Sequence, residues 1–193
     1  MKFLTFLKML AGTVLLATTA TWATAVRADV LVNGDFEDGL AAWTTNGFFF
    51  EGYDFGLTAD AHSGDSAFFG GAVQSLGYLN QSLATEAGTT YRVSFWLASD
   101  GYQPSQFQVL ANGNLLLDLV DLSLQPYTAY SVAFTALTAS SYLQFGFRND
   151  AGALQLDKVS VTAVPEPGAA ALLALGLLAV AAQRRRAGRP SAH

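Results

Sequence analysis

The chain has 193 residues, a formal net charge of −5 and 51% hydrophobic residues, and it contains no cysteine. Between residues 29 and 164 only Arg92, Arg148 and Lys158 are basic, against fourteen carboxylates, so this region has a net charge of −11. A domain this acidic repels nucleic acid and anionic lipid headgroups, which leaves neutral ligands and cations as partners. Since disulfides are excluded, the fold depends on its hydrophobic core or on a bound metal ion.

The N-terminal residues have the pattern of a secretory signal peptide. Lys2 and Lys8 flank the start of an apolar stretch over residues 9–20, and Val26-Arg27-Ala28 is a cleavage site of the A-x-A kind. The sequence therefore predicts a signal peptide over residues 1–28 and a mature chain that begins at Asp29. The 136 residues from 29 to 164 are enough for one domain with its own core.

Residues 29–162 carry strand signals and no amphipathic helix pattern. The segment 90–97 alternates with period two, which predicts an inward row of Tyr91, Val93, Phe95 and Leu97. Residues 107–110 and 115–117 flank an Asn-Gly pair and read as a hairpin. Further segments of strand length cover 130–134, 141–147 and 154–162. Short, evenly spaced strands favour an all-β sandwich.

Four segments carry a more specific pattern: Val30-Leu31-Val32-Asn33-Gly34-Asp35-Phe36-Glu37, Gly39-Leu40 with Trp43, Ala61-His62-Ser63-Gly64-Asp65-Ser66-Ala67, and Leu154-Gln155-Leu156-Asp157-Lys158-Val159-Ser160-Val161. Together they resemble the galactose-binding-like jelly rolls, which include many carbohydrate-binding modules. The resemblance covers essentially all of residues 29–162 and implies an all-β, jelly-roll β-sandwich. It is only weakly specific for a ligand, because the same scaffold also serves surface proteins without one.

The resemblance also implies a structural Ca²⁺ site. In such jelly rolls an acidic residue near the N-terminus, a His-Ser-Gly loop and an aspartate at the start of the last strand often meet around the ion. The matching positions here are Glu37, Ser63, Asp65 and Asp157. Oxygen ligands from distant segments suit a hard cation and would join the first strand to the last. The alternative is that Glu37 and Asp65 are ordinary turn residues.

Candidate ligand-binding residues have the outward phase of three predicted strands. They are Arg92, Ser94 and Trp96 on the first, Gln106 and Gln108 on the second, and Tyr142, Gln144 and Arg148 on the third. If these strands share a sheet, they form one polar face with two aromatic platforms, which suits a neutral glycan because a sugar ring stacks on an aromatic plane while amides bind its hydroxyls. The alternatives are a solvated face and a face covered by a loop.

Other aromatic residues point to the core. Phe36 and Trp43 are predicted to fill the sandwich, since aromatic residues beside a strand usually do. The segment 48–55 holds five aromatics and two acids without alternation, and it fits either a binding loop or a partly buried strand.

The sequence offers no set of catalytic residues. His62 is the one histidine between residues 29 and 164, and no Gly-x-Ser-x-Gly elbow surrounds Ser63. A glycoside hydrolase needs two suitably spaced carboxylates, which any acidic surface can provide. We therefore expect a protein that is not an enzyme, with a secreted glycoside hydrolase as the weakest alternative.

The C-terminal tail combines Val164-Pro165-Glu166-Pro167-Gly168, an apolar run over 169–182 and a basic cluster over 184–189 that includes Arg184, Arg185 and Arg186. It resembles the PEP-CTERM sorting signal of Gram-negative, exopolysaccharide-producing bacteria, which an exosortase recognises at Pro165, Glu166 and Pro167. The apolar run is predicted to be a single transmembrane helix with the arginines in the cytoplasm. The alternative is a buried helix packed on the domain.

The predicted organisation is therefore a signal peptide over 1–28, a β-sandwich domain over 29–162 and a sorting tail over 163–193. We expect an exported protein that is held transiently in the inner membrane, processed by exosortase and delivered to the cell surface or to the exopolysaccharide of a biofilm. Its sandwich is predicted to bind carbohydrate without catalysis. The alternative is a structural or adhesive surface protein with no dedicated ligand.

Overall fold

The computed structural model describes residues 28–49, 54–165, 175–180 and 183. Ten strands are described: β1 (Thr44–Gly47), β2 (Phe55–Thr58), β3 (Ala67–Gly70), β4 (Gly77–Ala84), β5 (Thr90–Ser99), β6 (Ser105–Ala111), β7 (Asn114–Val120), β8 (Gln125–Thr135), β9 (Ser140–Asn149) and β10 (Leu154–Ala163).

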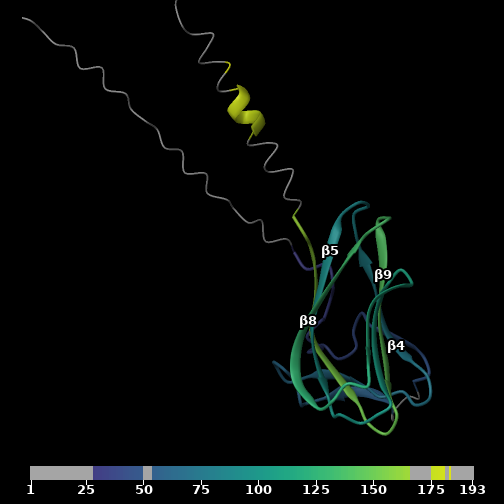
Figure 1. Ribbon diagram of the computed structural model, residues 1–193. Coiled ribbons are helices and arrows are strands. Elements are labelled where there is room, and N and C mark those ends of the chain that lie inside the picture. Colours follow the sequence, from purple (N-terminus) through teal and green to yellow (C-terminus); the bar gives the residue numbers. More distant parts are fainter. Residues whose placement is uncertain (1–27, 50–53, 166–174, 181–182, 184–193) are drawn as a thin grey trace, which may run out of the picture.

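The strands form two five-stranded antiparallel sheets, which face each other as the two layers of a sandwich (Figure 1). One sheet has the order β1-β4-β9-β6-β7 and the other β2-β3-β10-β5-β8. The predicted all-β sandwich is thus confirmed. Strands that are neighbours in a sheet are mostly distant in sequence, as in a jelly roll.

The space between the sheets is filled by alternate side chains from both layers. On β5 the side chains of Tyr91, Val93, Phe95 and Leu97 are buried, as the alternation predicted. Phe95 packs on Phe107 of the facing sheet, with ring centroids 5.5 Å apart. The buried core extends from Leu31 to Val161, so this region has the core of an independent domain.

The turn between β6 and β7 is the predicted Asn-Gly hairpin. Asn112 and Gly113 have φ angles of 51° and 77°. Two successive positive φ values are the mark of the type I′ turn, whose twist matches that of the paired strands. Asn112 Oδ1 also accepts a hydrogen bond from Tyr142 N at 2.8 Å, which ties the turn to β9.

The first described residues of the domain pair with its last strand. Asp29 forms a β-bridge with Thr162, and Val30 N donates to Val161 O at 2.9 Å. Asp29 Oδ1 accepts hydrogen bonds from Leu31 N and Val161 N at 2.9 and 2.8 Å. The two ends of the domain are therefore joined through backbone hydrogen bonds and through the side chain of Asp29.

The predicted tail is described only in part. Val164 N still donates to Thr90 O at 2.8 Å, and residues 175–180 are helical. Among the described residues, no helix is both long and apolar enough for a membrane span. The signal peptide up to residue 27, the rest of the predicted span, Glu166, Pro167 and the arginines at 184–186 lie outside the described residues.

Candidate functional site

The predicted ligand-binding residues lie on two sheets and not on one. β5 belongs to the sheet β2-β3-β10-β5-β8, whereas β6 and β9 belong to the other sheet. Trp96 and Tyr142 therefore lie on opposite outer faces of the sandwich, and the condition for one polar face with two aromatic platforms is not met. Alternation gives the phase of each strand correctly but carries no information about which strands become neighbours.

Five of the predicted residues share the outer face of the sheet that contains β4, β6 and β9. The register places Gln106 opposite Arg148, Gln108 opposite Gly146, and Gln144 opposite Asn80. Tyr142 lies farther along β9 and is 36% exposed. We call this surface the amide face; its members are Tyr78, Asn80, Gln106, Gln108, Tyr142, Gln144 and Arg148.

Tyr78 on β4 is the aromatic residue of the amide face that sequence reasoning missed. Its register partner on β9 is Gly146. A Cβ atom on Gly146 would lie 2.9 Å from Tyr78 Cε1 and 3.4 Å from Gln108 Cβ, so the tyrosine ring passes directly over a position without a side chain. The signal that was available is the alternation of Tyr78, Asn80 and Ser82 with the buried Leu79 and Leu83.

Hydrogen bonds within the amide face fix some of its groups and leave others open. Asn80, which is 1% exposed, donates from Nδ2 to Thr44 O at 3.1 Å and accepts from Gln144 Nε2 at 3.1 Å. Gln106 Nε2 donates to Asp118 Oδ1 at 2.9 Å. Within the described part of the chain, the amide of Gln108 and the hydroxyls of Tyr78 and Tyr142 have no hydrogen-bond partner.

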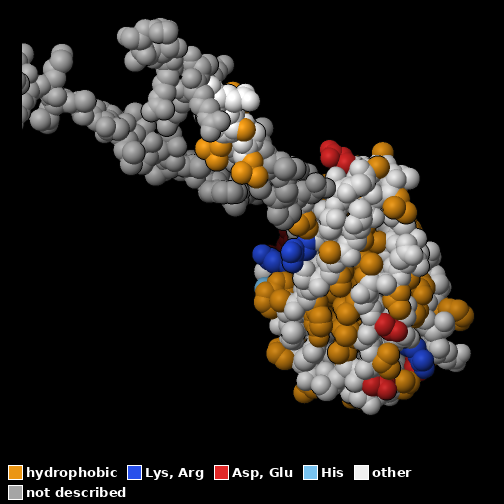
Figure 2. Space-filling view, turned by 45° about the horizontal axis from the view of Figure 1, so that its top comes forward, with side chains coloured by type: hydrophobic (Ala, Val, Ile, Leu, Met, Phe, Trp, Pro, Cys, Tyr) orange, Lys and Arg blue, Asp and Glu red, His pale blue; other side chains and the backbone are white. Residues whose placement is uncertain are grey.

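The one guanidinium group of the amide face is paired. Arg148 Nη2 lies 2.6 Å from Asp150 Oδ2. The hydrogen bond from Arg148, followed by that from Gln74 N, lowers the pKa of the Asp150 carboxyl, and the same pair raises the pKa of Arg148. Because its guanidinium group is neutralised, this face matches a neutral ligand better than an anionic one. Figure 2 shows one side of the domain, on which the Lys, Arg, Asp and Glu side chains are few and scattered.

The opposite outer face is covered at Trp96 by the loop after β2. The ring of His62 stacks on Trp96 with centroids 3.9 Å apart and planes at 18°. Tyr127 of β8 stands edge-on to His62, and its hydroxyl donates to Asp60 O at 2.7 Å. Burial, then Asp157 and Asp60, raises the pKa of the Tyr127 hydroxyl. We call the outer face of the sheet β2-β3-β10-β5-β8 the covered face. Trp96 does not offer a free aromatic platform there.

Arg92, which was predicted to bind ligand together with Ser94 and Trp96 of the same strand, lies at the opposite end of β5 from the covering loop. It is exposed and pairs in register with Thr162 of β10 and Ala133 of β8. It belongs to the same outer face as Trp96, so it cannot act together with the residues of the amide face.

The four residues of the predicted calcium site contact one another in two pairs along one loop, Asp157 with Ser63 and Glu37 with Asp65. Asp157 is buried on β10, where Oδ2 accepts from Ser63 N at 3.0 Å and Oδ1 from Lys158 N at 2.6 Å. Glu37 Oε1 accepts from Asp65 N and Ser66 N at 2.9 and 3.0 Å. Burial raises the pKa of the Asp157 carboxyl, although the hydrogen bonds from the amides of Ser63 and Lys158 lower it.

These contacts show how far the cluster fits a cation. The loop donates N–H groups to both carboxylates, and with Lys158 N the amide donors occupy three of the four carboxylate oxygens of Glu37 and Asp157. Among the described residues, no group of three or more His, Cys, Asp and Glu side chains is placed to hold a metal ion. Calcium binding stays a prediction.

Of the aromatic segment 48–55, the described residues Phe49 and Phe55 contribute to the core. Phe36 and Trp43 are both buried with ring centroids 5.4 Å apart, as predicted. Phe49 packs on Phe55 at 4.9 Å, and both rest on the core, whereas Phe48 is 52% exposed. Residues 50–53 lie outside the described part of the chain.

Comparison with known proteins gives two independent results. Residues 163–186 match the PEP-CTERM protein-sorting motif, so the predicted tail is confirmed as such a motif, which implies export and exosortase-mediated sorting. No curated protein matches the chain.

The sandwich is similar in fold to carbohydrate-binding modules and to adhesin domains. The module TmCBM61, solved with β-1,4-galactotriose, is 18% identical over 71% of this chain and 99% of its own, with a TM-score of 0.57. The K3 adhesin domain of Lys-gingipain from Porphyromonas gingivalis is 22% identical over 70% and 98% (TM-score 0.56). The CBM22-1 xylan-binding domain of Xyn10C from Paenibacillus barcinonensis is 17% identical over 72% and 97% (TM-score 0.52). At these identities the likeness shows the fold alone.

Proposed function

We propose that the β-sandwich is a non-catalytic carbohydrate-binding module and that its amide face takes a neutral glycan. The observation that carries the proposal is the ring of Tyr78 laid over Gly146, with the amide of Gln108 beside it. A sugar ring stacks its C–H face on such a ring, while neighbouring amides and hydroxyls bind its hydroxyl groups. The fold shared with two carbohydrate-binding modules supports the proposal.

The composition of the amide face narrows the ligand. Gln106, Gln108 and Gln144 each provide a donor and an acceptor on one amide, which matches the dual character of sugar hydroxyls. Arg148 is neutralised by Asp150, so no free cation marks the face for a uronic acid or a sulfated sugar. We therefore expect neutral hexose or pentose chains to bind better than acidic ones.

The experiment is a glycan array probed with the domain of residues 29–164, beside the variants Tyr78→Ala and Trp96→Ala. Binding should weaken strongly in Tyr78→Ala, since stacking on one aromatic ring accounts for a large share of sugar affinity. It should persist in Trp96→Ala, whose ring is stacked on His62. Loss in Trp96→Ala alone would move the site to the covered face.

A second candidate function is adhesion without a dedicated glycan. The adhesin domain of Lys-gingipain has the same fold with a similar TM-score. Absence of any signal across neutral and acidic glycans on the array would favour this function, since an acidic, cysteine-free sandwich can act as a building block of a surface protein.

For localisation we propose that the tail holds the protein in the inner membrane of a Gram-negative bacterium until exosortase transfers it to the cell surface or the extracellular matrix. The sorting motif at 163–186 supports this proposal. Replacing Pro165 and Pro167 by Ala should leave the domain folded and stop its sorting. Normal surface delivery of this double variant, measured by cell fractionation, would rule out recognition through the two prolines.

We also keep structural calcium as a proposal of its own. The contacts of Glu37 and Asp157 with the same loop, residues 62–66, support it, whereas the amide donors on both carboxylates count against it. If calcium binds, chelation lowers the melting temperature of the 29–164 domain, and Glu37→Gln removes the difference. Identical melting curves with and without chelator would rule out the calcium site.

A further inference from the structure

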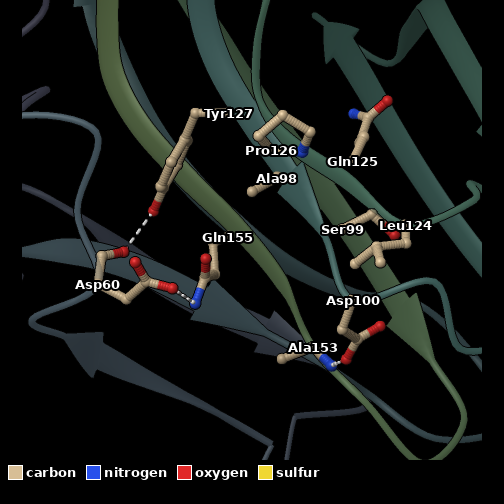
Figure 3. A pocket seen from close by; sticks show the side chains of 10 residues that line it. All are labelled: Asp60, Ala98, Ser99, Asp100, Leu124, Gln125, Pro126, Tyr127, Ala153 and Gln155. Carbon is tan, nitrogen blue, oxygen red and sulfur yellow. Dashed lines mark hydrogen bonds between the residues drawn. The ribbon is translucent and has the colours of Figure 1, made fainter.

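A groove of about 510 Å³ lies on the covered face, where Asp60 of the covering loop is one of its lining residues (Figure 3). Its floor is made of small residues, Ala98 and Ser99 on β5 and Ala153 before β10. Leu124, Pro126 and Tyr127 supply one wall. The volume falls within the range of small-molecule sites, roughly 300–1,000 Å³.

Polar groups are held in place around this floor. Asp60 is fixed from two sides, because its carbonyl accepts from the Tyr127 hydroxyl at 2.7 Å and its carboxylate from Gln155 Nε2 at 3.3 Å. Asp100 Oδ2 accepts from Ala153 N at 2.6 Å, and Oδ1 from the buried Asn149 at 2.8 Å. Figure 3 shows Gln155 pointing at Asp60 and Ala153 beside Asp100. The two carboxylates are thus oriented before any ligand arrives.

No positive charge compensates these carboxylates within the groove. Its lining contains neither Lys nor Arg. Of the three basic residues between 29 and 164, Arg148 is paired with Asp150, Arg92 is near the other end of β5, and Lys158 lines a separate hollow beside Asp35. A ligand with a positive charge would gain from pairing with either carboxylate at the rim of the groove.

We propose that this groove is a second binding site, on the sheet opposite the amide face, and that it takes a sugar unit with a free, protonated amine. The ammonium group pairs with Asp60 or Asp100, and the amides of Gln125 and Gln155 bind hydroxyls. The apolar wall of Pro126 and Tyr127 takes the C–H face of the ring. Such a unit occurs in de-N-acetylated amino-sugar polymers.

The test is an NMR titration of the ¹⁵N-labelled 29–164 domain with three tetrasaccharides of similar length: the β-1,4-linked glucosamine tetramer, its fully N-acetylated form, and cellotetraose. We expect the free-amine tetramer to shift the amide signals of Ala98, Ala153 and Gln155. The other two sugars should not shift these signals, because they carry no charge. Added salt should weaken the free-amine complex.

The variant Asp60→Asn separates a specific site from general attraction to an acidic domain. It keeps an acceptor for Gln155 and removes one charge, and it should weaken free-amine binding about tenfold. The matched control is Glu86→Gln, which removes the same charge from the exposed turn at the other end of β5 and should leave the affinity unchanged.

Four outcomes would overturn the proposal: equal weakening by Glu86→Gln, equal binding of the N-acetylated tetramer at the groove, shifts at Tyr78 and Gln108 only, or no shifts. Shifts at the amide face alone would contradict the second site and still support glycan binding by that face. Conversely, a silent glycan array leaves the groove proposal intact, because the two sites lie on opposite sheets.

Discussion

The outer faces of the two sheets begin from the same strand alternation and differ in what lies over them. On the amide face the ring of Tyr78 lies over Gly146, and a free amide stands next to it. On the covered face His62 stacks on Trp96, and the loop that carries it is anchored to Asp157. An outward aromatic residue is therefore available to a ligand on one sheet and used for packing on the other.

The difference has a physical origin in two residues. Gly146 removes a side chain from the centre of one sheet, so a neighbouring ring can lie close to the backbone. Asp157 places a buried acceptor on the other sheet, and a buried acceptor has to be satisfied, here by backbone amides of the covering loop. A side chain at position 146 should displace the Tyr78 ring, and loss of the Asp157 carboxylate should release the covering loop.

The largest effect is expected for Asp157→Ala, which removes the anchor of the covered face. The amides of Ser63 and Lys158 lose their acceptor, and unsatisfied buried donors cost about 1–3 kcal/mol each. We expect the free energy of unfolding to fall by about 3 kcal/mol in urea denaturation. The control is Asp118→Ala, at an exposed carboxylate beside the amide face, which should cost no more than about 0.5 kcal/mol. Equal losses would show that the loop is not anchored through Asp157.

A smaller loss is expected for Gly64→Ala in the same loop. A Cβ atom at Gly64 would meet Glu37 Oε1, which also accepts the amides of Asp65 and Ser66. With φ at 74°, the substitution also strains the backbone, and the two effects together should cost about 2 kcal/mol. Gly88→Ala separates them, because Gly88 has a φ of 85° but open space around its Cβ position. If both variants lose the same stability, the contact with Glu37 does not contribute to the loss and backbone strain accounts for it.

Carboxyl titration by ¹³C NMR compares the faces directly. Burial raises the pKa of Asp157, so the folded protein holds this proton more tightly than the unfolded chain, and its ionisation lowers stability as pH rises through the raised pKa. Arg148 lowers the pKa of Asp150. The pair therefore contributes stability at pH values above the ordinary carboxyl pKa, and this stability is lost as the pH falls through the lowered pKa. Arg148→Gln should return Asp150 toward its ordinary pKa and leave Asp157 unchanged. If Asp157 and Asp150 titrate with the same pKa, the predicted difference between the two faces is wrong.

Part of this picture could be predicted from the sequence. The inward row of β5, the Asn-Gly hairpin and the core positions of Phe36 and Trp43 depend on local periodicity and turn chemistry, which a single sequence carries. Sheet membership depends on contacts between distant segments, so Trp96 was grouped with strands of the opposite sheet. Tyr78 was missed because the polar Gln81 occupies an inward position of β4 between Leu79 and Leu83, which hides the alternation.

The smallest effect on stability, and a sharp one on binding, is expected for Gly146→Ala. The new Cβ would approach Tyr78 Cε1 to 2.9 Å, and the ring can rotate away at a cost below about 1 kcal/mol. A displaced ring no longer offers its plane, so affinity for the glycan found on the array should fall about tenfold. In a double-mutant cycle by calorimetry, Gly146→Ala should cause no further loss in the background Tyr78→Ala, because both changes remove the same platform. Additive losses would mean that Gly146 matters through the backbone and not through Tyr78.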